Sequence, residues 1–133
     1  MEVIRLDELY LTAMEHVDDP RNMGPLQEFN GHAKITGPCG DTMEFWIQVQ
    51  EGSIKKASFI TDGCGPSIAS GSMTTCLAQD KKVGEAKSIS QKDVLEALEG
   101  LPDESQHCAL LAANTLKAAC EDYLKKQKNQ ERI

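Results

Sequence analysis

Residues 42–61 read TMEFWIQVQEGSIKKASFIT, and this stretch decides the fold class. Apolar and polar side chains alternate over residues 42–50, which is the period of a strand with one buried face, and only Trp46 breaks the alternation by adding a large side chain on the other face. Residues 51–53 include a glycine and are typical of a hairpin turn, and residues 54–61 return as a second strand. The stretch therefore predicts an antiparallel hairpin. The apolar positions of its first strand are Met43, Phe45, Ile47 and Val49.

Outward from the hairpin, the sequence predicts one more strand and several helices. The strand is expected over residues 32–37. Apolar spacings of three and four residues predict helices over residues 3–16, 90–98 and 105–126. Another helix is expected to open at Pro66, because a proline fits the first helical position, where no N–H is needed. Since strands and helices are segregated along the chain, we expect an α+β fold, with a three-stranded antiparallel meander packed on one side by helices.

Composition and charge limit the class of protein. The 133 residues suit one domain, expected over residues 1–127, with a frayed tail over residues 128–133. The net charge is −7 and the one basic cluster is a lysine group near the C-terminus, which argues against nucleic-acid binding. No run approaches the roughly 20 apolar residues that a membrane span needs. The five cysteines are an odd number, so we expect free thiols and the reducing cytoplasm rather than a disulfide framework.

Three of these cysteines stand at boundaries between predicted elements. Cys39 lies just before a strand, Cys64 lies between a strand and a helix, and Cys108 lies near the start of the last helix. Thiolates are the usual ligands of iron–sulfur clusters and also bind zinc. The sequence therefore predicts that these three side chains hold a metal. Cys76 and Cys120 lie on apolar helix faces and are expected in the core.

Small and polar residues accompany the three cysteines. The neighbouring glycines would let the backbone approach a ligand closely; they are Gly40, Gly63 and Gly65. Asp41 is two residues from Cys39, so on an extended segment both side chains point to one face. His107 adjoins Cys108, but neighbouring helical residues point about 100° apart. The pair can share a metal only where the chain is irregular, and either Asp41 or His107 completes a four-ligand site. The other histidines, His16 and His32, are expected at the surface or at helix caps.

Taken in order, these motifs resemble those of the IscU/NifU N-terminal type of iron–sulfur scaffold protein. Residues 19–24, DPRNMG, resemble the Asn-Pro-Arg-Asn-Val-Gly opening of that family. Residues 39–41, CGD, resemble its first ligand motif. Residues 63–70, GCGPSIAS, resemble its Gly-Cys-Gly-x-x-Ile-Ala-Ser-Ser motif, and residues 107–108 resemble its third motif. The resemblance runs from about residue 19 to residue 123.

The resemblance implies a scaffold rather than an enzyme. It implies that Cys39, Cys64 and Cys108 bind an iron–sulfur cluster, that Asp41 keeps the cluster labile, and that His107 is an alternative ligand or a proton donor. The expected cluster is of the 2Fe-2S type, or a 4Fe-4S cluster on a homodimer, with zinc or iron as the alternative occupant. The expected partners are a cysteine desulfurase as sulfur donor and apo iron–sulfur proteins as acceptors.

The sequence departs from the family pattern at one motif, but it keeps the family's spacing between the second and third cysteines. Residues 101–105, LPDES, replace the Leu-Pro-Pro-Val-Lys motif that a dedicated Hsp70-type chaperone grips, which argues against that partner. The distance along the chain from Cys64 to Cys108 resembles the shorter IscU/NifU spacing. The zinc-dependent SufU branch carries an insertion there, so relay of sulfur by a zinc protein is disfavoured.

Cys108 is also predicted to accept sulfur from the desulfurase as a persulfide. Its place at a helix start should lower the pKa of its thiol, and His107 is close enough to move a proton. Residues 100–106 are polar and expected to move, whereas Cys39 and Cys64 are expected to be more enclosed. Two other functions remain open, a zinc-bound sulfurtransferase that relays persulfide and a structural or regulatory zinc domain.

Overall fold

The structure is a computed structural model that describes residues 11–131. Its elements are α2 (Leu11–Asp18), β1 (Gly31–Thr36), β2 (Thr42–Gln50), β3 (Ser53–Thr61), α3 (Gly65–Ala78), α4 (Val83–Lys87), α5 (Gln91–Ala97), the 3₁₀ turn η1 (Asp103–Ser105) and α6 (Gln106–Glu131). The helix predicted over residues 3–16 is described only from Leu11, where α2 begins.

The three strands form an antiparallel meander in the order β1-β2-β3, as predicted. Phe45 of β2 lies opposite Phe59 of β3, and both side chains are fully buried. The turn between these strands holds Glu51 and Gly52 at positive φ, which is the backbone of a tight two-residue hairpin turn. The alternation seen in the sequence therefore fixes which face of β2 enters the core.

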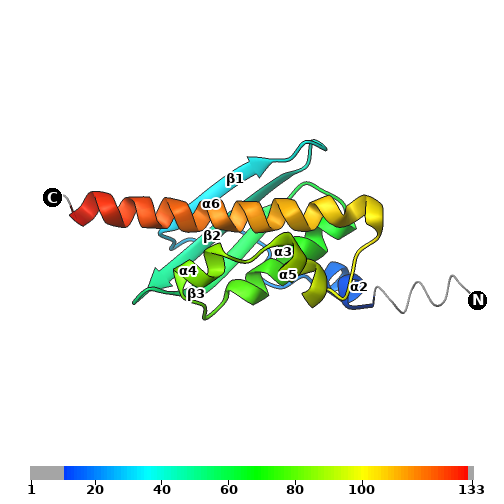
Figure 1. Cartoon of the computed structure of the whole chain (residues 1–133), viewed down its shortest axis with the longest axis horizontal. Coiled ribbons are helices and arrows are strands. Elements are labelled where there is room, and N and C mark those ends of the chain that lie inside the picture. Colours follow the sequence, from blue (N-terminus) through cyan, green and yellow to red (C-terminus); the bar gives the residue numbers. More distant parts are fainter. Residues whose placement is uncertain (1–10, 132–133) are drawn as a thin grey trace, which may run out of the picture.

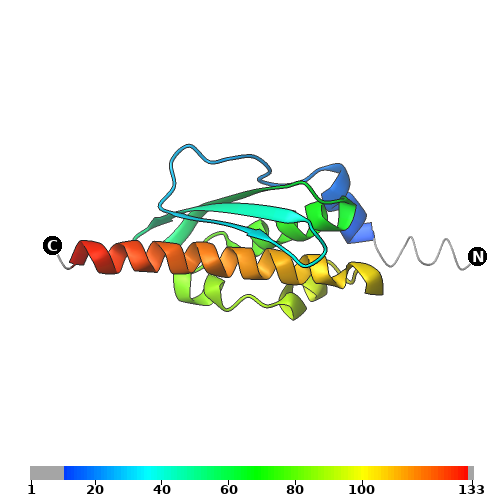
Figure 2. The same cartoon turned by 90° about the horizontal axis from the view of Figure 1, so that it is seen from above.

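Helices cover one side of this sheet, and Figure 2 shows the sheet and the helices as separate layers. Helix α6 lies across β1 and β2, and α3 packs against β3 (Figure 1). The approach of α3 is close, because a Cβ at Gly71 would meet the Phe59 ring at 2.4 Å. Helices α4 and α5 pack on α6, and α2 packs on α3. The fold is thus the predicted α+β meander with helices on one side.

A connecting segment, residues 19–30, crosses the opposite face of the sheet (Figure 2). It begins on the outer edge of β3, where the Phe59 N–H donates to the Asn22 carbonyl at 3.0 Å and the Gly24 N–H donates to the Phe59 carbonyl at 2.8 Å. It ends beside β2, where the Val49 N–H donates to the Asn30 side chain at 2.8 Å. The segment therefore ties α2 to the sheet and pairs part of an edge strand that would otherwise be open.

Several predictions of detail are wrong. Helix α6 continues to Glu131, beyond the predicted end at residue 126. Helix α4 and the turn η1 were not predicted, because each is only one or two turns long and shows little periodicity. Cys76 is exposed, although it was expected in the core, whereas Cys120 is buried as predicted. Within residues 11–131, no helix is both long enough and apolar enough to cross a membrane.

Candidate metal centre

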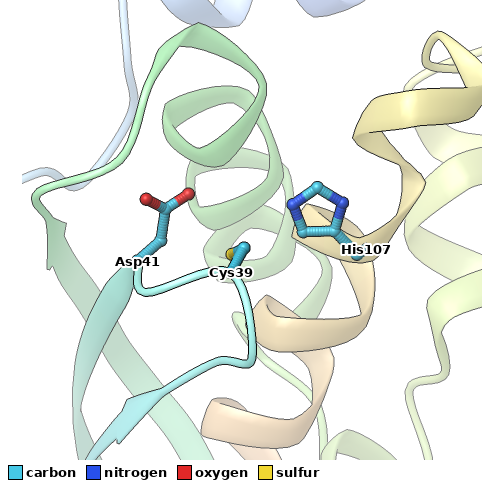
Figure 3. A group of neighbouring side chains, drawn as sticks. All are labelled: Cys39, Asp41 and His107. Atoms are coloured by element: carbon cyan, nitrogen blue, oxygen red, sulfur yellow. The ribbon is translucent and has the colours of Figure 1, made fainter.

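Three segments that are distant in sequence meet at one end of the sheet. They are the β1–β2 loop, the β3–α3 junction and the start of α6 (Figures 1 and 3). The loop is closed by hydrogen bonds from the Gly37 N–H to the Asp41 carbonyl at 2.8 Å and from the Gly40 N–H to the Gly37 carbonyl at 3.0 Å. The Thr42 N–H donates to the Asp62 carboxylate at 2.7 Å, which fastens the loop to the end of β3. These hydrogen bonds fix the position of the β1–β2 loop relative to the β3–α3 junction.

The loop and the helix start bring Cys39, Asp41 and His107 together. One ligand atom from each of the three lies within 4.8 Å of the others, and Figure 3 shows Cys39 between Asp41 and His107. Cys39 and His107 are exposed and Asp41 is half-buried. A thiol, a carboxylate and an imidazole form a donor set that suits zinc or iron. The structure thus brings together Asp41 and His107, which the sequence offered only as alternatives.

Cys108 lies beside this group but faces inward. Its side chain is only 2% exposed. Its Sγ lies 3.7 Å from Nε2 of His107, so the two neighbouring side chains approach each other although they stand on one helix. The geometric objection to a shared role for His107 and Cys108 is therefore removed. The expectation that Cys108 would be the accessible thiol is wrong, because Cys39 and Cys64 are the exposed ones.

The electrostatics of Cys108 also differ from the prediction. Burial raises the pKa of the Cys108 thiol, and negative charges on Cys64, Asp41 and Cys39 raise that pKa further. A hydrogen bond from Ser67 acts in the opposite direction and is the second-largest influence on this pKa. The predicted lowering of the pKa by the helix start therefore does not hold in this structure, because desolvation of the thiolate dominates.

Cys64 occupies the N-cap of α3. Its carbonyl accepts hydrogen bonds from the N–H groups of Ser67 at 3.0 Å and Ile68 at 3.1 Å, while its side chain is exposed. Cys64 is not one of the three residues whose ligand atoms lie within 4.8 Å of each other. Its charge nevertheless acts on Cys108, so the two thiols belong to the same end of the molecule.

Ser67 is a site residue that the sequence did not single out. Its side chain is fully buried, and its Oγ lies 3.3 Å from Oδ2 of Asp41 and 3.4 Å from Sγ of Cys108. Gly63 makes room for this arrangement, since a Cβ there would lie 2.4 Å from the Ser67 hydroxyl and 3.0 Å from Asp41 Oδ2. The glycine before Cys64 is thus required by neighbouring side chains and not only by a ligand. The available signal was the position of Ser67 three residues after Cys64, on the same turn of a helix.

The chain is similar to known proteins over most of its length. Residues 10–130 match the family described as NifU-like N terminal domain. The iron–sulfur cluster assembly scaffold protein IscU 1 of Archaeoglobus fulgidus is 38% identical over 120 residues, covering 90% of this chain and 78% of that protein. The IscU scaffold protein of Escherichia coli strain K12 is 40% identical over 119 residues, covering 86% of this chain and 92% of that protein.

A solved structure shares the fold at much lower identity. The N-terminal NifU-like protein from Brucella abortus superposes with a TM-score of 0.74 at 15% identity, over 91% of this chain and 98% of that one. At that identity the likeness bears on the fold alone, and the family model and the IscU relatives carry the assignment. The chain belongs to the family of NifU-like N-terminal domains.

Proposed function

We propose that this chain is a scaffold on which iron–sulfur clusters are assembled and from which they pass to apo-proteins. The observation that carries the proposal is the meeting of Cys39, Asp41 and His107 at the end of the molecule that also holds Cys64 and Cys108. Thiolates are the usual ligands of these clusters. The two relatives above are named as cluster assembly scaffolds, which supports the same function here.

In this proposal the cluster is cargo, of the 2Fe-2S type on one chain or a 4Fe-4S cluster on a homodimer. Cys39, Cys64 and Cys108 supply its thiolate ligands. Asp41 supplies a harder oxygen ligand that holds iron less firmly, and His107 stands by as an alternative ligand or proton donor. Two of the three thiols are exposed, so cargo is loaded and removed at the surface. A site built to hold and release cargo needs no catalytic turnover of its own.

The proposed partners follow from the chemistry of loading and release. A cysteine desulfurase supplies sulfur and apo iron–sulfur proteins receive the cluster, in the cytoplasm, where all five thiols stay free as they are here. Cys108 remains our proposed persulfide acceptor because His107 Nε2 lies 3.7 Å from its sulfur. Since that sulfur is buried, acceptance requires the start of α6 to move and expose it.

A zinc-bound sulfurtransferase is the second candidate. The donor set of Cys39, Asp41 and His107 favours it, because one thiolate, one carboxylate and one imidazole also suit tetrahedral zinc. In that case the protein would relay persulfide without building a cluster.

Anaerobic reconstitution separates the two functions. The protein is incubated with a cysteine desulfurase, cysteine, ferrous iron and a thiol reductant, which supplies the electrons that reduce persulfide sulfur to sulfide, and then with an apo iron–sulfur acceptor. A scaffold gains visible absorbance with bound iron and sulfide, and loses both as the acceptor gains them. Persulfide transfer by a colourless, zinc-loaded protein that never gains bound sulfide would overturn the scaffold proposal and favour the sulfurtransferase.

A further inference from the structure

The buried hydroxyl of Ser67 joins two members of the candidate metal centre. Its Oγ lies 3.4 Å from Cys108 Sγ on one side and 3.3 Å from Asp41 Oδ2 on the other. The Ser67 side chain is 0% exposed, so solvent does not compete for these contacts. A hydroxyl that touches both a buried sulfur and a carboxylate is placed to orient both.

The other buried hydroxyls of α3 are used differently. Three of them donate to carbonyls of their own helix, which is the common way to satisfy a serine or threonine inside a helix; they are Ser70, Thr74 and Thr75. Ser72 accepts a hydrogen bond from the Arg21 N–H at 2.8 Å and lies 2.7 Å from Nδ1 of His16. Within α3, the hydroxyl of Ser67 is therefore the one aimed at the candidate metal centre.

The backbone around Ser67 fixes this aim. The Ser67 N–H donates to the Cys64 carbonyl at 3.0 Å, so the serine is held to the turn that carries a predicted ligand. The absence of a side chain at Gly63 leaves the space that the Ser67 hydroxyl and Asp41 Oδ2 occupy.

We propose that Ser67 is a positioning residue that orients Cys108 and Asp41 toward a metal bound at the centre. The proposal deepens the proposed scaffold site and rests on it. A hydroxyl has one hydrogen, so it donates to only one of its two neighbours at a time. When the hydroxyl donates to Cys108, the hydrogen bond orients the sulfur as a metal ligand. When it donates to Asp41, the hydrogen bond holds the carboxylate against the β3–α3 junction. Ser67 thereby couples the softest and the hardest of the expected ligands.

The test uses zinc alone, cobalt as its spectroscopic substitute, and two alanine variants. Ser67→Ala removes the hydroxyl that faces the centre, and Ser70→Ala removes a buried hydroxyl of the same helix that bonds only the Pro66 carbonyl. Loss of a group that orients a metal ligand costs roughly 10-fold or more in affinity. We expect Ser67→Ala to bind zinc about 10-fold more weakly and to show weaker sulfur-to-cobalt charge-transfer absorption, while Ser70→Ala matches wild type in both.

A merely structural role predicts a different pattern. It would lower the free energy of unfolding of both apo variants and leave the cobalt spectrum of each unchanged. Wild-type zinc affinity and cobalt absorption in Ser67→Ala, or equal losses in Ser70→Ala, would overturn the proposal. These measurements need no desulfurase and no cluster, so they test the role of Ser67 even if the wild-type protein fails to assemble a cluster. Such a failure would count against the scaffold function alone.

Discussion

At the scale of single residues, exposure to solvent does not separate the three candidate ligand cysteines from the other two cysteines. Cys39, Cys64 and Cys76 are exposed, while Cys108 and Cys120 are buried. Burial raises the pKa of Cys120 to about 12, and this thiol lies among core side chains. Cys108 differs from Cys120 in its polar neighbours, because its Sγ lies 3.4 Å from Ser67 Oγ and 3.7 Å from His107 Nε2. The neighbouring groups, not the accessibility, therefore mark the candidate ligands.

The cysteines allow matched substitutions. Replacing Cys39, Cys64 or Cys108 singly by serine should remove most bound iron and sulfide, because a serine oxygen is a harder and poorer ligand for iron than a thiolate. Cys76→Ser is the exposed control and Cys120→Ser is the buried one. Both controls should keep the wild-type iron and sulfide content after anaerobic reconstitution. A Cys64→Ser protein with full cluster content would remove Cys64 from the site.

The carboxylate of Asp41 should set how long the cluster lasts. A carboxylate holds iron less tightly than a thiolate does, and it can admit water to the site. Asp41→Ala should therefore give a cluster that decays more slowly in air and passes more slowly to an acceptor. The decay of visible absorbance in air measures the first rate, and the iron and sulfide recovered with the separated acceptor measure the second. Faster decay than in wild type would mean that Asp41 is a required ligand.

The acceptor of sulfur can be mapped directly. We expect the persulfide on Cys108 after incubation with a desulfurase and cysteine, with His107 moving the proton during transfer. Mass spectrometry of alkylated peptides locates it. Because Cys39 and Cys64 are the two exposed thiols of the candidate site, they are the competing acceptors. A persulfide on either one, undiminished in Cys108→Ser, would refute the assignment and leave the scaffold function untouched.

At the scale of elements, α3 explains why one helix face was assigned wrongly. Much of its buried surface is serine, threonine and glycine rather than large apolar side chains. Ser70 and Thr74 donate to carbonyls of their own helix, so their hydroxyls enter the core at little cost. A prediction based only on apolar residues overlooks such a buried face, and for this reason it wrongly placed Cys76 in the core. Gly71 completes the face, since any larger residue would collide with Phe59.

The contact between α2 and α3 should depend on pH through His16. This histidine was expected at the surface but is buried, with Nδ1 2.7 Å from Ser72 Oγ. Ser72 Oγ also accepts a hydrogen bond from the Arg21 N–H, so the His16 ring lies in a closed polar contact between α2 and α3. Burial is the main cause that lowers the pKa of His16 from 6.5, and the charge of Arg21 lowers it further.

The sign of the pH effect follows from this shift. A histidine with a lowered pKa in the folded state contributes its full stability above pH 6.5 and loses it as the pH falls below that value. Wild type should lose more thermal stability between pH 7.5 and 5.5 than His16→Asn, whose amide does not titrate. Thermal melts at the two pH values measure the difference. Equal losses in both proteins would exclude His16 as the titrating group.

At the scale of the whole molecule, the candidate metal centre joins three separate parts of the chain. A ligand held by residues 37–41, the β3–α3 junction and the start of α6 binds only the folded arrangement, so it stabilises that arrangement by mass action. We expect zinc to raise hydrogen-exchange protection over residues 37–41 and 100–108. Identical protection of both segments with and without zinc would contradict a shared site.

The sequence by itself determined the meander, the face of β2 that enters the core and the set of candidate ligands. Alternation along a strand and the residues of a tight turn act over short distances, so they can be deduced without the fold. The positions of Cys39, Cys64 and Cys108 at element boundaries could be predicted for the same reason, and the two-residue interval from Cys39 to Asp41 correctly placed both in one group.

Only the tertiary structure decided which thiol is covered and which groups share a site. Three features depend on how α6 and α3 pack against the loop. They are the burial of Cys108, the placing of His107 within 4.8 Å of Asp41 and Cys39, and the position of the Ser67 hydroxyl between Asp41 and Cys108. A thiol pKa follows desolvation, and desolvation is set by neighbours that lie far away in sequence. For that reason the local argument from the helix start predicted the wrong direction for the pKa shift of the Cys108 thiol.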